Sequence, residues 1–102
     1  MSKQLPRAAR TAQLLEVALN TAERRGIWKM TRNEIAEGAG VTMALVTLYL
    51  GTMVQIQRSV IRHAIHTRRI PVIAEALARG NTYVKDLPQD LKDEAARHVA
   101  GG

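Results

Sequence analysis

TRNEIAEGAGVTMALVTLYLGT, residues 31–52, is the stretch of sequence that decides the fold. Thr31 and Glu34 have the spacing of a capping box, in which two side chains satisfy the first free N–H groups of a helix. The glycine-rich residues 38–41 follow as a tight turn. Thr42 is then placed to cap a second helix. The stretch therefore predicts two short helices joined by a tight turn.

The same stretch has the register of a helix-turn-helix between Arg32 and Gly51. Such a unit needs a small residue where the helices touch, a glycine in the turn, and apolar residues on the inner faces. Ala36 occupies the contact position and Gly40 the turn position. The inner positions are filled by Ile35, Ala39, Val41, Val46 and Tyr49. We therefore predict a helix-turn-helix centred near Gly40.

Helical patterns continue on both sides of this unit. Before it, Gly26 ends a helix over residues 7–25. One face of that helix carries Leu15, Ala18, Leu19 and Ala22. After it, Thr52 caps a long helix that Pro71 ends or kinks.

The last third of the chain extends the helical pattern. An apolar face continues to Gly80, which is a second stop. Asp86 as cap and Pro88 in the first turn then begin a short final helix. We therefore expect an all-α fold, a compact bundle of five or six helices in one domain spanning residues 1–102.

Composition limits the class of protein. The 102 residues include one Trp, two Tyr, no Phe and no Cys. A core without Phe must be built from Ala, Leu, Ile and Val, which favours helices over a sheet. The absence of cysteine excludes a disulfide framework, a thiolate zinc site and a cysteine nucleophile. With no signal-peptide pattern and no apolar run near the ~20 residues of a membrane span, we expect a cytoplasmic protein that does not contact membranes.

The positive charge is unevenly distributed along the chain. The formal net charge is +6, with +5 in residues 1–32, +2 in residues 33–70 and −1 in residues 71–102. A clustered excess of Lys and Arg is the electrostatic pattern of proteins that bind a polyanion. The first two thirds of the chain are therefore expected to face nucleic acid.

Residues 35–42 (IAEGAGVT), together with Leu45, Val46 and residues 49–52 (YLGT), resemble the DNA-binding domain of TetR-type repressors. The resemblance covers about residues 10–65. It implies that the helix after Thr42 is the recognition helix and that the chain binds a palindromic operator as a homodimer. The sequence departs from the family pattern at Thr47 and Met53, where the family usually has a tyrosine and a lysine that touch phosphate.

The resemblance also defines how the chain is divided. It implies a three-helix DNA-binding unit over residues 7–51 and a helical dimerisation segment over residues 52–100. Only 53 residues follow Tyr49, which is much less than the usual ligand-binding part of the family. We therefore expect a shortened repressor without a small-molecule inducer.

The outward residues of the expected recognition helix are the candidates for contact with base edges. They are Thr42, Met43, Ala44, Thr47 and Leu48. Arg, Asn and Gln are missing from this set, so the usual bidentate contacts to guanine or adenine are missing too. Methyl and hydroxyl groups suit thymine methyl groups and phosphate oxygens. We therefore expect apolar contacts and DNA shape to carry specificity.

Phosphate contacts are expected around the starts of the helices, where free N–H groups and the positive dipole end also favour anions. The candidates are Lys29, Thr31, Arg32, Asn33, Tyr49 and Thr52. The first residues read as a flexible arm that reaches along the DNA with Lys3, Arg7 and Arg10.

A dimer is expected because the C-terminal segments carry many apolar residues. The candidates for burial, within the subunit or across a two-fold axis, are Ile61, Ile65, Val72, Ile73, Ala76 and Leu77. A symmetric interface built from these residues would hold two recognition helices about 34–36 Å apart.

Other chemistry is not favoured by the sequence. His63 and His66 lie three residues apart on one helix and His98 is remote, so no set of metal ligands is expected. No catalytic constellation or phosphate-binding loop is present, and we expect neither an enzyme nor a cofactor. Two alternatives to a repressor remain open. One is an architectural DNA-binding protein, and the other is a protein-interaction module such as an antirepressor.

Overall fold

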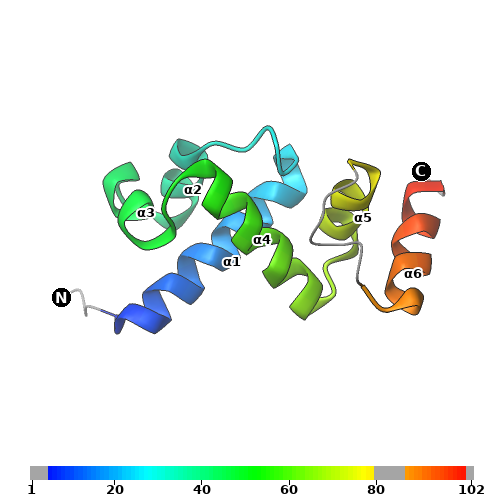
Figure 1. The fold of residues 1–102 in the computed structure, drawn as a ribbon. Coiled ribbons are helices and arrows are strands. Elements are labelled where there is room, and N and C mark those ends of the chain that lie inside the picture. The colour runs from blue at the N-terminus through cyan, green and yellow to red at the C-terminus, as the bar shows by residue number, and fades with distance from the viewer. Residues whose placement is uncertain (1–4, 80–86, 101–102) are drawn as a thin grey trace.

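Helix α1 (Arg7–Arg25) runs through the molecule and supports four other helices (Figure 1). The structure is a computed structural model that describes residues 5–79 and 87–100. Leu14, Ala18 and Leu19 are fully shielded from solvent on one face of α1. Because α2, α3, α4 and α5 all pack against α1, this face forms the centre of the core. The bounds agree with the predicted helix, but Leu14 takes the buried position that the sequence pattern gave to Leu15.

Helices α2 (Arg32–Ala39) and α3 (Met43–Leu50) form at the predicted caps. The Thr31 hydroxyl accepts from the N–H of Glu34, whose carboxylate accepts from the N–H of Thr31 at 3.0 Å. Gly40 ends α2 in the left-handed conformation, with φ 69°. A Cβ at Gly40 would meet nothing within 4 Å, so the backbone conformation rather than crowding requires glycine there.

Helix α4 (Met53–Thr67) begins with a second capping box, between Thr52 and Gln55. It ends at Thr67, earlier than the predicted end at Pro71. Arg68 turns the chain in the left-handed conformation, and its N–H bonds to carbonyl groups of the last turn. Pro71 instead lies in the first turn of the next helix, where its missing N–H costs no hydrogen bond.

Helices α5 (Ile70–Ala78) and α6 (Gln89–Ala100) cover one another at the other end of the chain. Leu87, Leu91 and Ala95 pack from the α6 side and are at most 8% exposed. The predicted stop at Gly80 and the predicted cap Asp86 lie outside the described residues. Pro88 precedes α6, and its carbonyl accepts hydrogen bonds from Leu91 and Lys92.

The described residues thus form six helices and no strand, in an elongated molecule of 46 × 23 × 21 Å. Figure 1 shows α2 and α3 at one end of the long direction and α5 and α6 at the other. None of the helices in the described ranges combines the length and the apolar character needed to cross a bilayer.

The expected dimer residues are mostly buried inside the single chain. Exposure is at most 1% for Ile61, Val72, Ile73 and Ala76, so these four side chains are buried within the subunit, the first of the two expected possibilities, and offer no surface to a partner. They are covered because α4, α5 and α6 pack on one another. Ile65 and Leu77 are only partly buried and remain candidates.

A partly buried carboxylate links α5 to the loop that leads into α2. Glu75 accepts a hydrogen bond of 2.8 Å from the backbone N–H of Ile27. Gly26 makes room for it, because a Cβ there would lie 3.0 Å from a Glu75 oxygen. The carbonyl of Ile27 lies 3.5 Å from the Gln57 side-chain nitrogen on α4. The polar groups of this loop residue are therefore held by two separate helices.

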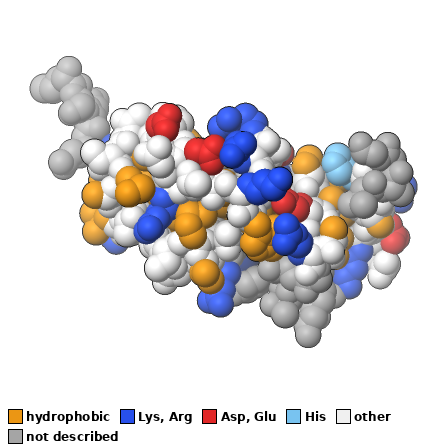
Figure 2. Space-filling model, turned by 90° about the horizontal axis from the view of Figure 1, so that it is seen from above, with side chains coloured by type: hydrophobic (Ala, Val, Ile, Leu, Met, Phe, Trp, Pro, Cys, Tyr) orange, Lys and Arg blue, Asp and Glu red, His pale blue; other side chains and the backbone are white. Residues whose placement is uncertain are grey.

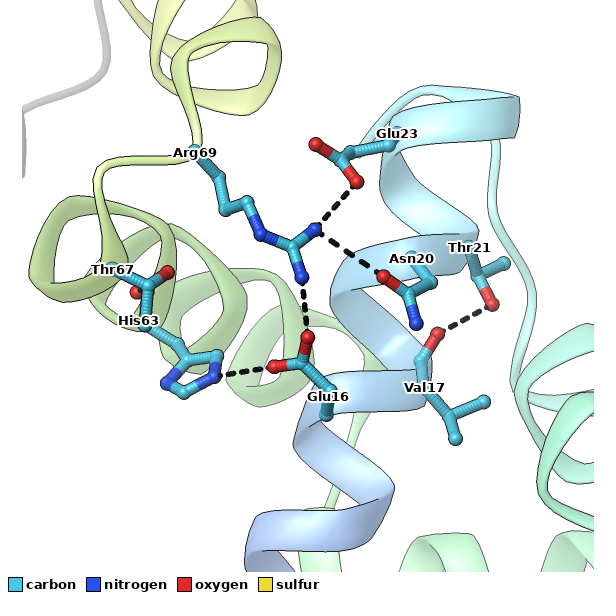
Figure 3. A network of polar contacts seen from close by, with 8 residues as sticks. All are labelled: Glu16, Val17, Asn20, Thr21, Glu23, His63, Thr67 and Arg69. Atoms are coloured by element: carbon cyan, nitrogen blue, oxygen red, sulfur yellow. Dashed lines mark hydrogen bonds and ion pairs between the residues drawn. The ribbon is translucent and has the colours of Figure 1, made fainter.

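A second polar network fastens the α4–α5 corner to α1 (Figure 3). Arg69 donates hydrogen bonds to Glu16 and Glu23, and a third one to Asn20 at 3.2 Å. The second oxygen of Glu16 lies 3.0 Å from Nε2 of His63. The Arg69 side chain is 29% exposed, so solvent screens its ion pairs only in part.

Replacing Ile73 tests the burial of α5. Ile73→Ala should lower the free energy of unfolding by about 2–5 kcal/mol, because it leaves a cavity where a fully buried side chain stood. Val54→Ala, at a site that is 56% exposed, should cost less than about 1 kcal/mol. Urea titrations followed by circular dichroism measure both. Similar losses for the two variants would contradict the placement of Ile73.

Replacing Arg69 tests the corner network. Arg69→Ala should lower the free energy of unfolding by about 1–3 kcal/mol, because one guanidinium holds two carboxylates and an amide. The matched control is Arg24→Ala, which removes an exposed arginine from the last turn of α1 and should cost under about 0.5 kcal/mol. Thermal or urea unfolding compares them, and an Arg69 variant as stable as the control would argue against the network.

Candidate nucleic-acid interface

The outward face of α3 is apolar and exposed. Met43 is 49% exposed and Leu48 63% exposed, while Val46 and Leu50 on the opposite face are buried. All five predicted base-contact residues, Thr42, Met43, Ala44, Thr47 and Leu48, are exposed together on this element. In Figure 2, hydrophobic side chains reach the surface at the end of the molecule that carries α3, with Lys and Arg side chains beside them.

This face results from local sequence. Thr42 caps α3 by accepting a hydrogen bond from the N–H of Leu45 at 3.2 Å. Two glycines, Gly40 and Gly51, delimit the helix and keep it to eight residues. With Val46 and Leu50 turned into the core, the residues on the other side of the helical wheel must face outward.

Three arginines lie close to α3 and contact uncharged groups. Arg32, in the first turn of α2, donates to the Thr47 hydroxyl at 3.1 Å. The Arg7 guanidinium lies 5.1 Å from the centre of the Tyr49 ring. Arg10 donates to the side-chain oxygen of Gln13, one turn along α1. None of these contacts neutralises the positive charge.

Arg7 and Arg10 lie in the predicted helix and not in the flexible arm to which their DNA contacts were assigned. Both belong to the first turns of α1, so they hold fixed positions on a helix. The α1 start lies beside α3, because Arg10 and Tyr49 line the same small hollow. Lys3, the third residue predicted for the arm, lies outside the described residues.

Three other arginines are paired with carboxylates. Arg25 lies 2.7 Å from Glu34. Arg68 lies 3.4 Å from each of two acidic side chains on α6, and Arg69 contacts Glu16 and Glu23. Ion pairing therefore offsets the charges of Arg25, Arg68 and Arg69, whereas the arginines beside α3 contact uncharged groups.

The predicted phosphate-binding residues divide into two groups. Lys29 is exposed, Arg32 lies beside α3, and Tyr49 belongs to α3 and is partly buried. Thr31 uses its hydroxyl both to cap α2 and to contact Glu34, and Asn33 donates its amide to Glu37 at 2.8 Å. Those two side chains are engaged within the chain.

Thr52 has a structural role at the start of the next helix. Its hydroxyl accepts from the N–H of Gln55 at 3.2 Å and completes the α4 capping box. The residue is exposed, so the capped end of α4 reaches the surface just after α3. Met53, at the position where the resembled family has a lysine, is partly buried and packs against the core.

A basic groove on α4 was missed by the sequence analysis. Arg58 and Arg62 line it with Gln55 and Ser59, next to the end of α3. The groove has a volume of about 530 Å³, and no carboxylate is among its lining residues in the described chain. The signal was present in the sequence, because two arginines four residues apart lie off the buried stripe of α4.

Comparison with known proteins identified no relative of this chain. No protein-family model, curated protein or solved structure matches the chain. Within residues 5–79 and 87–100, no three His, Cys, Asp or Glu side chains lie close enough to hold a metal ion. The α3 face and the charges around it are therefore the features of the molecule that bear on its function.

Proposed function

We propose that the chain is a sequence-specific regulator of transcription that binds double-stranded DNA, most simply as a repressor on a palindromic operator. In this proposal α2 and α3 act as a helix-turn-helix, with α3 in the major groove. The carrying observation is the exposed face of α3 with Arg7, Arg10 and Arg32 nearby, whose contacts within the described residues are all to uncharged groups. Phosphate groups on both sides of the groove would pair with these arginines and neutralise their charges.

The shape of the site supports this function. A helix with side chains is about 10–12 Å across and enters a major groove about 12 Å wide. The short α3 lies at one end of the molecule, so that a duplex can approach it without meeting α5 or α6. Arg58 and Arg62 on α4 extend the basic surface beyond the end of α3 and supply the cations that Met53 does not.

The resemblance to TetR-type repressors points the same way. It concerns the α2–α3 register, with Ala36 and Gly40 at the contact and turn positions. Ala36 is 3% exposed and Gly40 has the left-handed conformation, which are the properties these positions require. The exposed apolar residues of α3 also favour a second candidate, a helix that binds another protein, and DNA-binding experiments separate the two.

A homodimer must place two copies side by side. Recognition helices on one face of DNA need a separation of about 34–36 Å. The chain is 46 Å long with α3 near one end, so an end-to-end pair would separate the helices too widely. A groove of about 460 Å³ between α5 and α6 offers an apolar surface for the partner, lined in part by Leu77, Ala78 and Ala96.

Salt dependence tests the electrostatic part of the proposal. For an operator selected from random duplexes, log affinity should fall with log salt by about 0.9 for each phosphate neutralised. Arg32→Ala and Arg58→Ala should each flatten the slope by about one phosphate, because each cation faces the proposed DNA surface. Fluorescence anisotropy across a salt series measures the slopes.

Arg97→Ala on α6 is the control for these variants. Arg97 is exposed at the opposite end of the molecule, so its loss should leave the slope unchanged. An affinity that does not depend on salt, or equal effects of all three variants, would refute the assignment of the basic surface.

A charge in the α5–α6 groove tests the dimer. Ala96 is exposed, so Ala96→Asp should leave the fold intact but split the pair, and operator affinity should drop by about 10²-fold or more. Ala12→Asp, on the exposed side of α1, should leave the dimer mass unchanged. Light scattering measures the mass. A wild-type monomer at micromolar concentration that binds its palindrome tightly as one subunit would overturn the dimer.

A further inference from the structure

We infer that the α3 face distinguishes pyrimidines by their 5-methyl group, and that it therefore accepts 5-methylcytosine in place of thymine. This inference rests on the proposed DNA-binding function and concerns how the same site selects its sequence. It is carried by the chemistry that α3 exposes and by the hydrogen bonds of Thr47.

The centre of the exposed face has no hydrogen-bond donor. Met43, Ala44 and Leu48 present only methyl, methylene and thioether groups to solvent. Met43 and Leu48 are also among the most exposed large apolar residues in the described parts of the chain. In the major groove such a surface gains free energy by burying the methyl group of a base.

Thr47 is the polar residue between Met43 and Leu48, and its hydroxyl hydrogen is already used. The hydroxyl donates to the carbonyl of Met43 at 3.2 Å and accepts from Nη1 of Arg32 at 3.1 Å. With its proton directed at its own helix, Thr47 has no donor for a base. Its methyl group joins the apolar surface of Leu48 and Met43.

This arrangement removes the usual means of telling thymine from cytosine. Thymine presents the O4 acceptor and the methyl group, whereas cytosine presents the N4 amino donor and no methyl. Met43, Ala44, Thr47 and Leu48 provide no donor for O4, so a thymine that faces these four side chains is not recognised through O4. Thr42, the cap residue before the helix, is outside this set. The methyl group is the remaining difference, and 5-methylcytosine carries it too.

Charge favours DNA as the occupant of this apolar face. The cations around the face match a polyanion, because phosphates line both sides of the groove that the helix would enter. Arg7 and Arg32 contact only neutral side chains, and Arg58 lines a groove free of carboxylates among its described lining residues. A polyanion with methyl groups on its recognition edge matches both properties.

The DNA test changes one methyl group at a time. Starting from an operator selected from random duplexes, each thymine is replaced by uracil, by cytosine or by 5-methylcytosine, with the complementary base adjusted. At thymines under α3, uracil should weaken binding about fourfold for one methyl lost and about fifteenfold when both half-sites lose it. 5-Methylcytosine should restore most of the affinity that cytosine loses.

The protein test uses two matched variants at Thr47, an exposed position where neither change should unfold the chain. Thr47→Val keeps the methyl group and removes the hydroxyl, so the preference for thymine over uracil should persist. Thr47→Ser keeps the hydroxyl and removes the methyl group. The ratio of the affinities for thymine and uracil should then approach 1 at a single base pair in each half-site. Val54→Ala on α4 should leave the preference unchanged.

The outcomes distinguish a failure of methyl recognition from a failure of the proposed DNA-binding function. Tight, selective binding with equal affinity for thymine and uracil throughout, or with no gain from 5-methylcytosine over cytosine, would overturn methyl recognition and leave the regulator intact. Loss of preference in Thr47→Val but not in Thr47→Ser would assign recognition to the hydroxyl and overturn it as well. If no duplex is preferred over competitor DNA, the proposed function itself fails.

Discussion

The buried face of α1 is the constraint on which the rest of the structure depends. Four helices pack against it, and the largest fully buried side chains of the described core are leucines and isoleucines. The core is therefore built from many small and medium side chains in close contact, where the loss of a single buried group is felt directly. By fixing α2 and α3 on one side and α4 and α5 on others, α1 sets where the exposed α3 face lies.

Local signals were predicted well from the sequence. The Thr31 and Thr52 caps and the left-handed turn at Gly40 depend on residues within a few positions of one another, so their chemistry is visible in the chain. The end of α4 was misplaced because Arg68, which is not a glycine, takes the left-handed conformation. Whether Ile73 is buried within the subunit or across an interface stayed open in the sequence, because only tertiary packing shows that α6 covers α5.

In the candidate site too, local features could be predicted from the sequence, whereas contacts between distant residues could not. The sequence indicated which α3 residues face outward, because their spacing follows from the helical period. It did not show which arginines are paired with carboxylates, since the carboxylates that neutralise Arg69 lie about fifty residues away along the chain. The groove at Arg58 was likewise hidden until α3 and α4 were placed against each other. Charge counts along a sequence thus do not show which charges the fold pairs.

The hydrogen bond between Glu75 and Ile27 has a mechanical consequence. Ile27 lies four residues before Thr31, so the peptide leading into α2 is tethered to α5 by a short length of chain. While that bond holds, a displacement of α5 must be passed on to the first turn of α2 or absorbed by bending the loop. One carboxylate oxygen thereby couples the position of α5 to that of α2, at opposite ends of the molecule.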